Sequence, residues 1–185
     1  MIAIFNGRYL LLLAMTLCVA LMSQAAIGSE AREIKWDDLM PDDWRPFDPY
    51  MDLDESQLNQ LYEGSPLEQQ LMRQYIEAMS SAPVVAALDG ERVRIPGYVV
   101  PLDFAGTELS EFLLVPYFGA CIHVPPPPSN QIIYVKSENA FKVEGLFTAV
   151  WVTGTISTQA HLNDLGDAGY TIEATKVELH KLPGE

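Results

Sequence analysis

Cysteine is scarce in this sequence. Only Cys18 and Cys121 occur among the 185 residues, and Cys18 lies in an apolar N-terminal stretch that we expect to be removed on export. The mature chain would then hold one thiol, which excludes an internal disulfide even in an oxidising compartment. The fold must therefore be stabilised by the packing of apolar side chains.

Positive charge is also scarce, since 11 Lys and Arg stand against 25 Asp and Glu and give a formal net charge of −14. Nucleic acids and anionic lipids are bound through a basic face, so this acidic chain is not expected to bind either. The sequence contains no GxSxG, GxxxxGK[ST] or GxGxxG motif, the patterns of serine nucleophiles and of phosphate or dinucleotide sites. We therefore expect a protein that is not an enzyme.

Long hydrophobic runs are missing outside the N-terminus. There, residues 9–22 are almost wholly apolar, which is shorter than the about 20 residues that a membrane-spanning helix needs. Arg8 precedes this run and the small residues of SQAAIGSE follow it, a pattern typical of a secretory signal peptide. Because Leu17 stands where a lipobox requires a small residue, we expect a plain signal peptide over residues 1–28 and not a lipoprotein. The mature protein is then expected in the periplasm, without stable membrane insertion.

An acidic arm is predicted over residues 29–64, which are dense in carboxylates, prolines and aromatics. Such a stretch is too apolar for a purely solvated tail. Its aromatic side chains, Trp36, Trp44, Phe47 and Tyr50 among them, are expected to dock either on the protein's own domain or on a partner. Both alternatives remain open.

One amphipathic helix is predicted over residues 65–83. Ser65 is a suitable N-cap, Pro66 fits the first turn and Glu68 completes a capping box. Apolar side chains then recur every four residues, which predicts one packing face.

The segment 84–185 has the period of two that is typical of strands. Asp89 and Gly90 lie between apolar runs and predict a hairpin turn, while Pro96 and Gly97 predict a bend or bulge in the strand that follows. Further strands are expected over 111–117, 131–135, 149–156 and 170–179. In the last of these the apolar face changes side, which predicts a bulge near Thr175. The connections 139–146 and 159–166 are each expected to contain a short helical turn.

These short strands predict a mainly β domain, a small OB-like barrel that is closed or partly open. The acidic arm and the amphipathic helix precede it.

The stretch GACIHVPPPPSNQ, residues 119–131, carries the most distinctive chemistry. Cys121 and His123 are two residues apart, so in an extended segment both side chains point to the same face. Thiolate and imidazole suit zinc and, in second place, copper. A structural zinc site takes four ligands, and His161, His180 and carboxylates are the other candidates. Two other interpretations remain open: Cys121 is a buried core residue, or its thiol is reactive or links to another chain.

The four prolines that follow, Pro125, Pro126, Pro127 and Pro128, predict a stiff polyproline segment with no hydrogen-bond donors. Such a ridge docks into an aromatic groove of a partner. Equally, it rigidly aims the residues on its two sides, the Cys-x-His pair before it and Asn130 and Gln131 after it. Neither role is excluded by the sequence.

The motifs GYVVPLDFAG, FLLVPYFGACIHVPPPPSNQIIYV, VWVTGTI and AGYTIEATKVE make the chain resemble a bacterial exported-protein family known only as a domain of unknown function. The resemblance extends from Trp36 to Leu179, and Tyr98 and the Cys-x-His-proline stretch belong to its most specific part. Genes of that family often look linked to ABC-transporter operons of the macrolide and lipoprotein exporter type, some of them zinc-responsive. The resemblance thus implies an accessory envelope protein connected with metal homeostasis. Its expected partner is an envelope protein, with an ABC-transporter permease ectodomain as the candidate.

Taken together, these observations predict a non-enzymatic periplasmic accessory protein of an envelope ABC-transport system. It would bind zinc, or copper as second choice, through Cys121 and His123, and would meet its partner through Tyr98, the four prolines, Asn130 and Gln131. The alternative is a metal-free interaction module that docks through the proline ridge and the aromatic arm.

Overall fold

The computed structural model describes residues 30–102, 108–120, 127–143, 145, 148–163 and 165–180. The predicted signal peptide therefore lies outside the described residues. No helix in the part of the chain that is described is long and apolar enough to cross a membrane.

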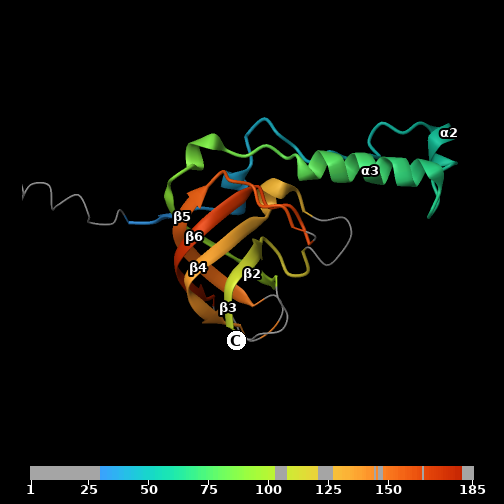
Figure 1. Cartoon of the computed structure of the whole chain (residues 1–185). Coiled ribbons are helices and arrows are strands. Elements are labelled where there is room, and N and C mark those ends of the chain that lie inside the picture. The colour runs from blue at the N-terminus through green and yellow to red at the C-terminus, as the bar shows by residue number, and fades with distance from the viewer. Residues whose placement is uncertain are drawn as a thin grey trace, which may run out of the picture. The chain divides into compact units, whose positions relative to one another are not determined.

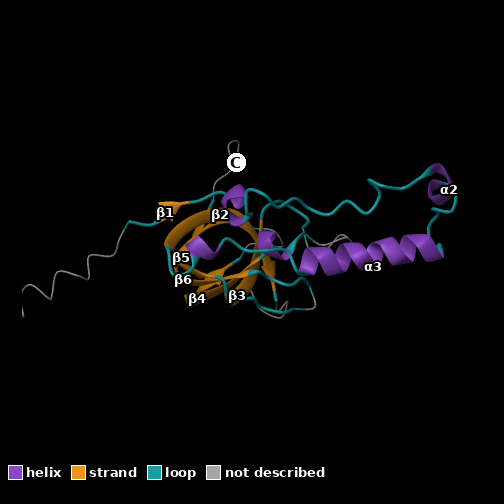
Figure 2. Cartoon of the chain, turned by 90° about the horizontal axis from the view of Figure 1, so that it is seen from above, coloured by secondary structure: helices purple, strands orange, loops and turns teal. Residues whose placement is uncertain are grey.

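Five strands form a closed barrel: β2 (Arg92–Pro101), β3 (Glu108–Val115), β4 (Ile133–Lys142), β5 (Ala149–Ser157) and β6 (Tyr170–Leu179). They pair in the order β2-β3-β4-β6-β5, and β5 pairs again with β2 to close the ring (Figures 1 and 2). The β4 and β6 pair is parallel and the other pairs of the ring are antiparallel. This arrangement agrees with the predicted mainly β, OB-like barrel.

The strand β2 closes the barrel because it pairs with two neighbours. Its residues 92–98 pair with β5, and Tyr98 onward pairs with β3. Pro96 and Gly97 lie inside this strand, which continues through them. A Cβ at Gly97 would come within 2.8 Å of the side chain of Leu114, so only glycine fits where β2 passes from one partner to the other.

The barrel interior is filled by alternate side chains of the strands, as their period of two predicts. This core contains Val93, Ile95, Val99, Phe112, Leu114, Ile133, Val135, Val150, Val152, Ile156, Tyr170, Ile172 and Ala174. Each large side chain buried in this way contributes about 1.5–3 kcal/mol. A second apolar cluster lies on the outer face of the strands β2, β3 and β4 and consists of Val100, Leu113, Val115, Ala120, Ile132, Tyr134 and Ala168.

The bulge predicted near Thr175 is confirmed. Thr153 on β5 pairs with Lys176, whereas the next residue, Gly154, pairs with Ala174. Thr175 is therefore the extra residue of β6, and the apolar side chains after it change face for this reason.

The hairpin predicted at Asp89 and Gly90 is wrong. The apolar run before it is not a strand but contains a 3-10 helix, η3 (Ala86–Leu88). Its apolar side chains pack against the barrel core, and the run pairs with none of the described strands. Leu88 is buried, with Val84 and Val85 packed against the same core. Gly90 has a φ of 80° and ends this turn just before β2.

The two predicted helical turns are also absent among the described residues of the connections. The first connection is shorter than expected, because β4 continues to Lys142 and pairs with Glu108 of β3. In the second, His161 forms an isolated antiparallel bridge with Ala168 instead.

The first part of the acidic arm docks on the barrel. For this part of the arm, the alternative in which it docks on the protein's own domain therefore holds. Its β1 (Arg32–Glu33) pairs in parallel with the start of β2, and η2 (Trp36–Leu39) follows. Trp36 Nε1 donates a hydrogen bond to the Pro96 carbonyl at 2.7 Å. The fully buried Tyr170 donates its hydroxyl to the Leu39 carbonyl at 2.9 Å and accepts from Val85 N at 2.6 Å.

The second part of the arm lies along the predicted helix. We call residues 46–81 the helical arm; it contains α2 (Glu55–Leu58) and α3 (Pro66–Ser80), and Figures 1 and 2 show the segment before α2 running beside α3. Ser65 caps α3 as predicted and accepts from Glu68 N at 3.1 Å. The Glu68 carboxylate accepts from Gly64 N rather than from the cap residue, so the reciprocal capping box is not formed.

Candidate functional site

The candidate site is the connection between β3 and β4, which contains the Cys-x-His-proline stretch. Of this connection the structure describes residues 116–120 and 127–132. Cys121, His123, Pro125 and Pro126 lie outside the described residues. The geometry of the site therefore comes from the two ends of the connection and from the side chains around them.

The end that follows β3 presents two aromatic side chains. Tyr117 is 54% exposed and Phe118 is 70% exposed. The Phe118 ring lies edge-on to the ring of Tyr98, with 6.3 Å between their centroids. Burial, and to a smaller extent the neighbouring Tyr117, raises the pKa of Tyr75 on α3 above its ordinary value. The connection therefore lies close to the helical arm.

The end that precedes β4 is held by polar side chains that are buried. Asn130 Nδ2 donates to the Pro83 carbonyl at 2.9 Å. Gln131 Nε2 donates to the Trp36 carbonyl at 2.9 Å. Asn130 is fully buried and Gln131 is 9% exposed. These amides tie the connection to the arm and to the segment before η3, so they support the site from inside the protein.

Two of the prolines belong to the same supported end. Pro127 is buried and Pro128 is half-buried. Pro128 has φ −57° and ψ 148° and begins η4 (Ser129–Gln131), which agrees with the expected polyproline geometry. The carbonyl of Ser129 accepts from Gly169 N at 2.7 Å. Pro127 and Pro128 thus lie at the anchored end of the connection, and both roles that the sequence left open for the ridge stay predictions.

A stacked tyrosine and histidine lie beside the connection. The rings of Tyr134 on β4 and His161 are 3.7 Å apart and inclined by 10°. The Tyr134 hydroxyl donates to Glu111 Oε2 at 2.7 Å. Burial, with this hydrogen bond, raises the pKa of Tyr134 to about 12. The sequence did not single out Tyr134, because a tyrosine in a strand is usually a packing residue.

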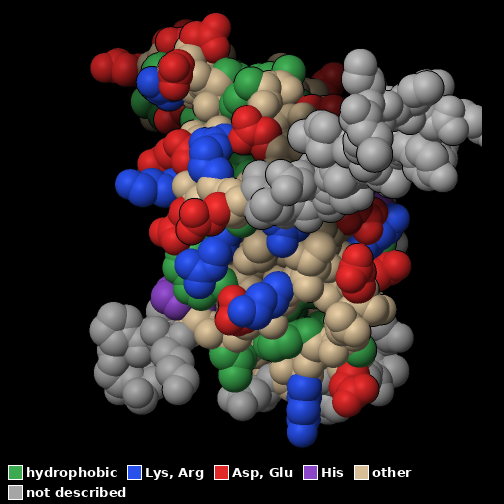
Figure 3. Space-filling view, turned by 90° about the vertical axis from the view of Figure 1, so that its left-hand side faces the viewer, with side chains coloured by type: hydrophobic (Ala, Val, Ile, Leu, Met, Phe, Trp, Pro, Cys, Tyr) green, Lys and Arg blue, Asp and Glu red, His purple; other side chains and the backbone are tan. Residues whose placement is uncertain are grey.

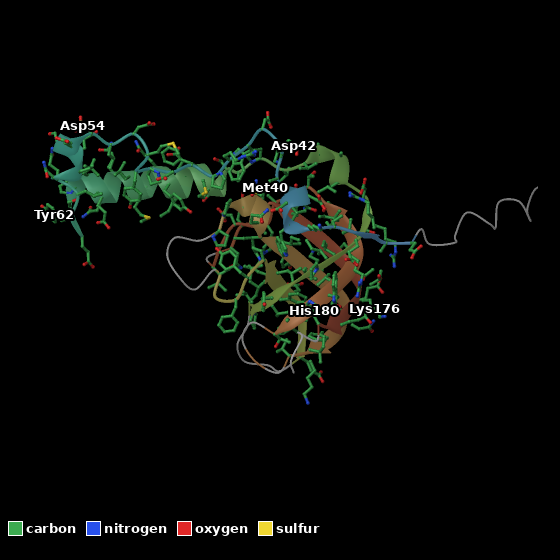
Figure 4. All side chains as sticks on the ribbon, turned by 180° about the vertical axis from the view of Figure 1, so that it is seen from behind. Met40, Asp42, Asp54, Tyr62, Lys176 and His180 are labelled. Atoms are coloured by element: carbon green, nitrogen blue, oxygen red, sulfur yellow. The ribbon has the colours of Figure 1, made fainter. Side chains whose placement is uncertain are left out.

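The two histidines that the sequence offered as additional metal ligands have different surroundings. His161 stacks on Tyr134, which shares the outer apolar cluster with Ala120, the last described residue before Cys121. His180 instead accepts a hydrogen bond at Nδ1 from Trp151 Nε1 at 3.0 Å. His180 and Lys176 lie together on the barrel (Figure 4). Of the two, His161 is therefore the one that contacts the cluster containing Ala120.

No group of three metal-ligating side chains is present among the residues with described positions. What the described part of the site offers is contact area: two exposed aromatic rings on a connection whose ends are fixed, with an imidazole ring beside it. Such an arrangement suits binding of another molecule, since aromatic side chains dominate interface energetics.

Comparison with known proteins identifies one family. The family model described as "Protein of unknown function (DUF3299)" matches residues 36–179. The crystal structure of a DUF3299 family protein from Pseudomonas aeruginosa PAO1 is 40% identical in sequence, with a TM-score of 0.64, and the match covers 84% of this chain and 100% of that chain. None of the curated proteins matches this chain.

Proposed function

We propose, from the premise that this chain belongs to the DUF3299 family, that it is a non-enzymatic accessory protein of the bacterial periplasm. In this proposal it serves an envelope ABC-transport system and binds the ectodomain of the permease through the connection between β3 and β4. The observation that carries the proposal is the exposure of Tyr117 and Phe118, 54% and 70%, at the start of this connection.

Both ends of the connection are anchored, which favours binding. Ala120 is 2% exposed and packs in the outer apolar cluster. At the other end Asn130 and Gln131 are held by hydrogen bonds to the backbone. An interface built on fixed segments loses less conformational entropy when it forms, so more of the contact energy of the aromatic rings remains as affinity.

The charge of the chain supports a protein as the partner. The formal net charge is −14, and anionic lipid surfaces and nucleic acids repel such a chain. A protein surface that accepts Tyr117 and Phe118 in apolar pockets fits better, because tyrosine and other aromatic residues are common among the residues that dominate protein interfaces.

Site-specific photo-crosslinking in the periplasm tests this proposal. A photoreactive phenylalanine analogue replaces Phe118 in one strain and the exposed Glu138, later on β4, in a control strain. We expect a crosslink to an ABC permease ectodomain from position 118 and not from position 138. Equal crosslinks from both positions, or none from position 118, would show that the connection is not the contact surface.

Metal binding through Cys121 and His123 is a second candidate function, with zinc preferred over copper. The observation that favours it is the position of His161, which stacks on Tyr134 in the cluster that also contains Ala120. We propose His161 as the third ligand. A ligand from the partner would complete the site.

The metal proposal is tested by native mass spectrometry of the purified mature protein. We expect one bound zinc ion that is lost in Cys121→Ser, His123→Ala and His161→Ala and is kept in His180→Ala, since His180 is engaged with Trp151. If Cys121→Ser and His123→Ala hold as much metal as the parent protein, the metal role fails. The metal-free interaction module would then be the better description.

A further inference from the structure

The helical arm, residues 46–81, holds most of the exposed apolar side chains in the described part of the chain. Among the described residues of the whole chain, ten large hydrophobic side chains are exposed. Six of them belong to this arm: Phe47, Tyr50, Met51, Leu58, Tyr62 and Ile76. Met51 and Tyr62 are 76% and 65% exposed. So many exposed apolar side chains on one segment point to an interaction surface.

A groove lies between the two halves of the arm. It has a volume of about 280 Å³ and is lined by Pro46, Phe47, Pro49 and Tyr50 on one side and by Met72 and Tyr75 of α3 on the other. Small-molecule pockets usually measure about 300–1,000 Å³, so this groove is of a size for a side chain of another protein. Two prolines in its wall restrict the backbone there.

The arm is strongly acidic. Between residues 46 and 81 there are seven carboxylates, Asp48, Asp52, Asp54, Glu55, Glu63, Glu68 and Glu77, and one cation, Arg73. The formal charge of the arm is thus −6. No ion pair between described residues involves any of these carboxylates. Figure 4 shows Asp54 and Tyr62 at the same end of the arm, the end that carries α2. Negative charge and an exposed aromatic side chain therefore both occur there.

A second copy of this chain does not match such a surface. On the barrel face shown in Figure 3, Lys and Arg side chains are interspersed with Asp and Glu. Four of the basic residues are already paired: Arg32 with Glu91, Arg94 with Glu33, Lys136 with Glu173 and Lys176 with Glu178. Two copies of formal charge −14 would repel each other, and so would the arm and an anionic membrane.

We infer that the helical arm is a docking element for a basic, amphipathic segment of another envelope protein. The partner segment places a large apolar side chain in the groove between Tyr50 and Met72, and its Lys and Arg side chains meet the carboxylates of the arm. Charge complementarity of this type raises the association rate and is weakened by salt. Its exposed side chains are other residues than Tyr117 and Phe118 of the connection, although Tyr75 in the wall of the groove neighbours Tyr117. The inference therefore extends the proposed function by a second contact.

Photo-crosslinking of the full chain in the periplasm also tests this inference. The analogue p-benzoylphenylalanine replaces Tyr62, an aromatic residue for an aromatic residue at an exposed position, and mass spectrometry identifies the crosslinked peptide. We expect a peptide from an envelope protein that has a net positive charge and at least one large apolar residue. A peptide from a second copy of this chain, a crosslink to lipid, an acidic peptide or no crosslink would each overturn the inference.

Matched variants measure which side chains of the arm are responsible. Leu58→Ser on α2 removes a leucine that is 51% exposed, and Leu179→Ser at the end of β6 removes one that is 47% exposed. We expect the first to lower the crosslinking yield by about tenfold and the second to leave it unchanged. Equal yields in the two variants would overturn the inference. Both sites are exposed, and a urea unfolding curve checks that each variant is folded.

Charge reversal separates the electrostatic attraction between arm and partner from the apolar contact in the groove. Asp52→Lys in the arm is expected to lower the yield by about tenfold, and salt is expected to lower the parent's yield in the same way. Glu138→Lys on β4 is the control and is expected to change nothing. A yield insensitive to Asp52→Lys overturns the charge match. Crosslinks from position 118 with none from position 62 would overturn this inference alone and leave the proposed function standing.

Discussion

The hydroxyl of Tyr170 joins three segments of the chain, so its removal is a sharp test of the fold. It donates to the carbonyl of Leu39 in the arm and accepts from the amide of Val85 before η3, at 2.9 and 2.6 Å. Tyr170 itself is fully buried on β6. Tyr170→Phe keeps the ring in the core and deletes only this oxygen. The Leu39 carbonyl and the Val85 amide are then left without their partner.

The expected loss follows from these two groups. A buried polar group that loses its partner costs about 1–3 kcal/mol, and Val85 is only half-buried, so water can reach its amide. We therefore expect Tyr170→Phe to lower the free energy of unfolding by about 2–4 kcal/mol. For a protein of this size that corresponds to a fall in Tm of roughly 5–15 °C.

Urea unfolding of the mature protein, followed by circular dichroism, measures this loss. Tyr62→Phe is the matched control, because Tyr62 is 65% exposed and water can hydrate either side chain; we expect a change within about 0.5 kcal/mol. Hydrogen exchange in Tyr170→Phe should also become faster at residues 34–40, as the arm loses its anchor. A loss below about 0.5 kcal/mol with unchanged exchange would refute this account of Tyr170.

Three further predictions concern the barrel and its surface. The raised pKa of Tyr134, about 12, means that its neutral form stabilises the fold. This contribution is complete below pH 10 and is lost as the pH rises toward 12. In Tyr134→Phe, the free energy of unfolding should therefore fall less across that pH range than in the parent protein. Gly154→Ala should lower the free energy of unfolding by at least about 1–3 kcal/mol, because a Cβ there would meet the Glu173 carbonyl and lie 2.8 Å from the Ala174 Cα. Gly145→Ala is the control in the same urea assay, since a Cβ there would have nothing within 4 Å. Trp36→Phe removes the hydrogen bond to the Pro96 carbonyl and should cost about 1 kcal/mol, measured by the same unfolding curve.

The barrel could be predicted from the sequence because buried apolar side chains alternate with more exposed ones along most of β2 and β5. Val93, Ile95 and Val99 all point into one core, and the change of face after Ala174 located the bulge. The apolar run before Asp89 was wrongly predicted as a strand, because its side chains pack on the core from a 3-10 turn. Apolar content alone does not distinguish such a turn from a strand. The end of β4 was missed since residues 136–142 are largely exposed and lack an apolar face.

The candidate site was predictable only in part. The family resemblance is confirmed by the match over residues 36–179. Trp36 and Phe47 look alike in the sequence, yet Trp36 packs on the barrel core and Phe47 is 42% exposed. That difference depends on contacts with residues far along the chain, such as Pro96. The stacking of His161 on Tyr134 has the same origin, since it joins the connection between β5 and β6 to the earlier strand β4.

The order of the strands has a kinetic consequence. β6 lies between β4 and β5, and β2 must meet β5, which follows it by three strands. The ring can therefore close only after the last strand is available, and non-local pairings of this kind form slowly, on a scale of milliseconds to seconds. Until then β4 and β5 each expose an unpaired edge, the usual template for aggregation. A chain of this topology depends on its final strand for completion, and the interval before β6 is in place is when it most needs protection.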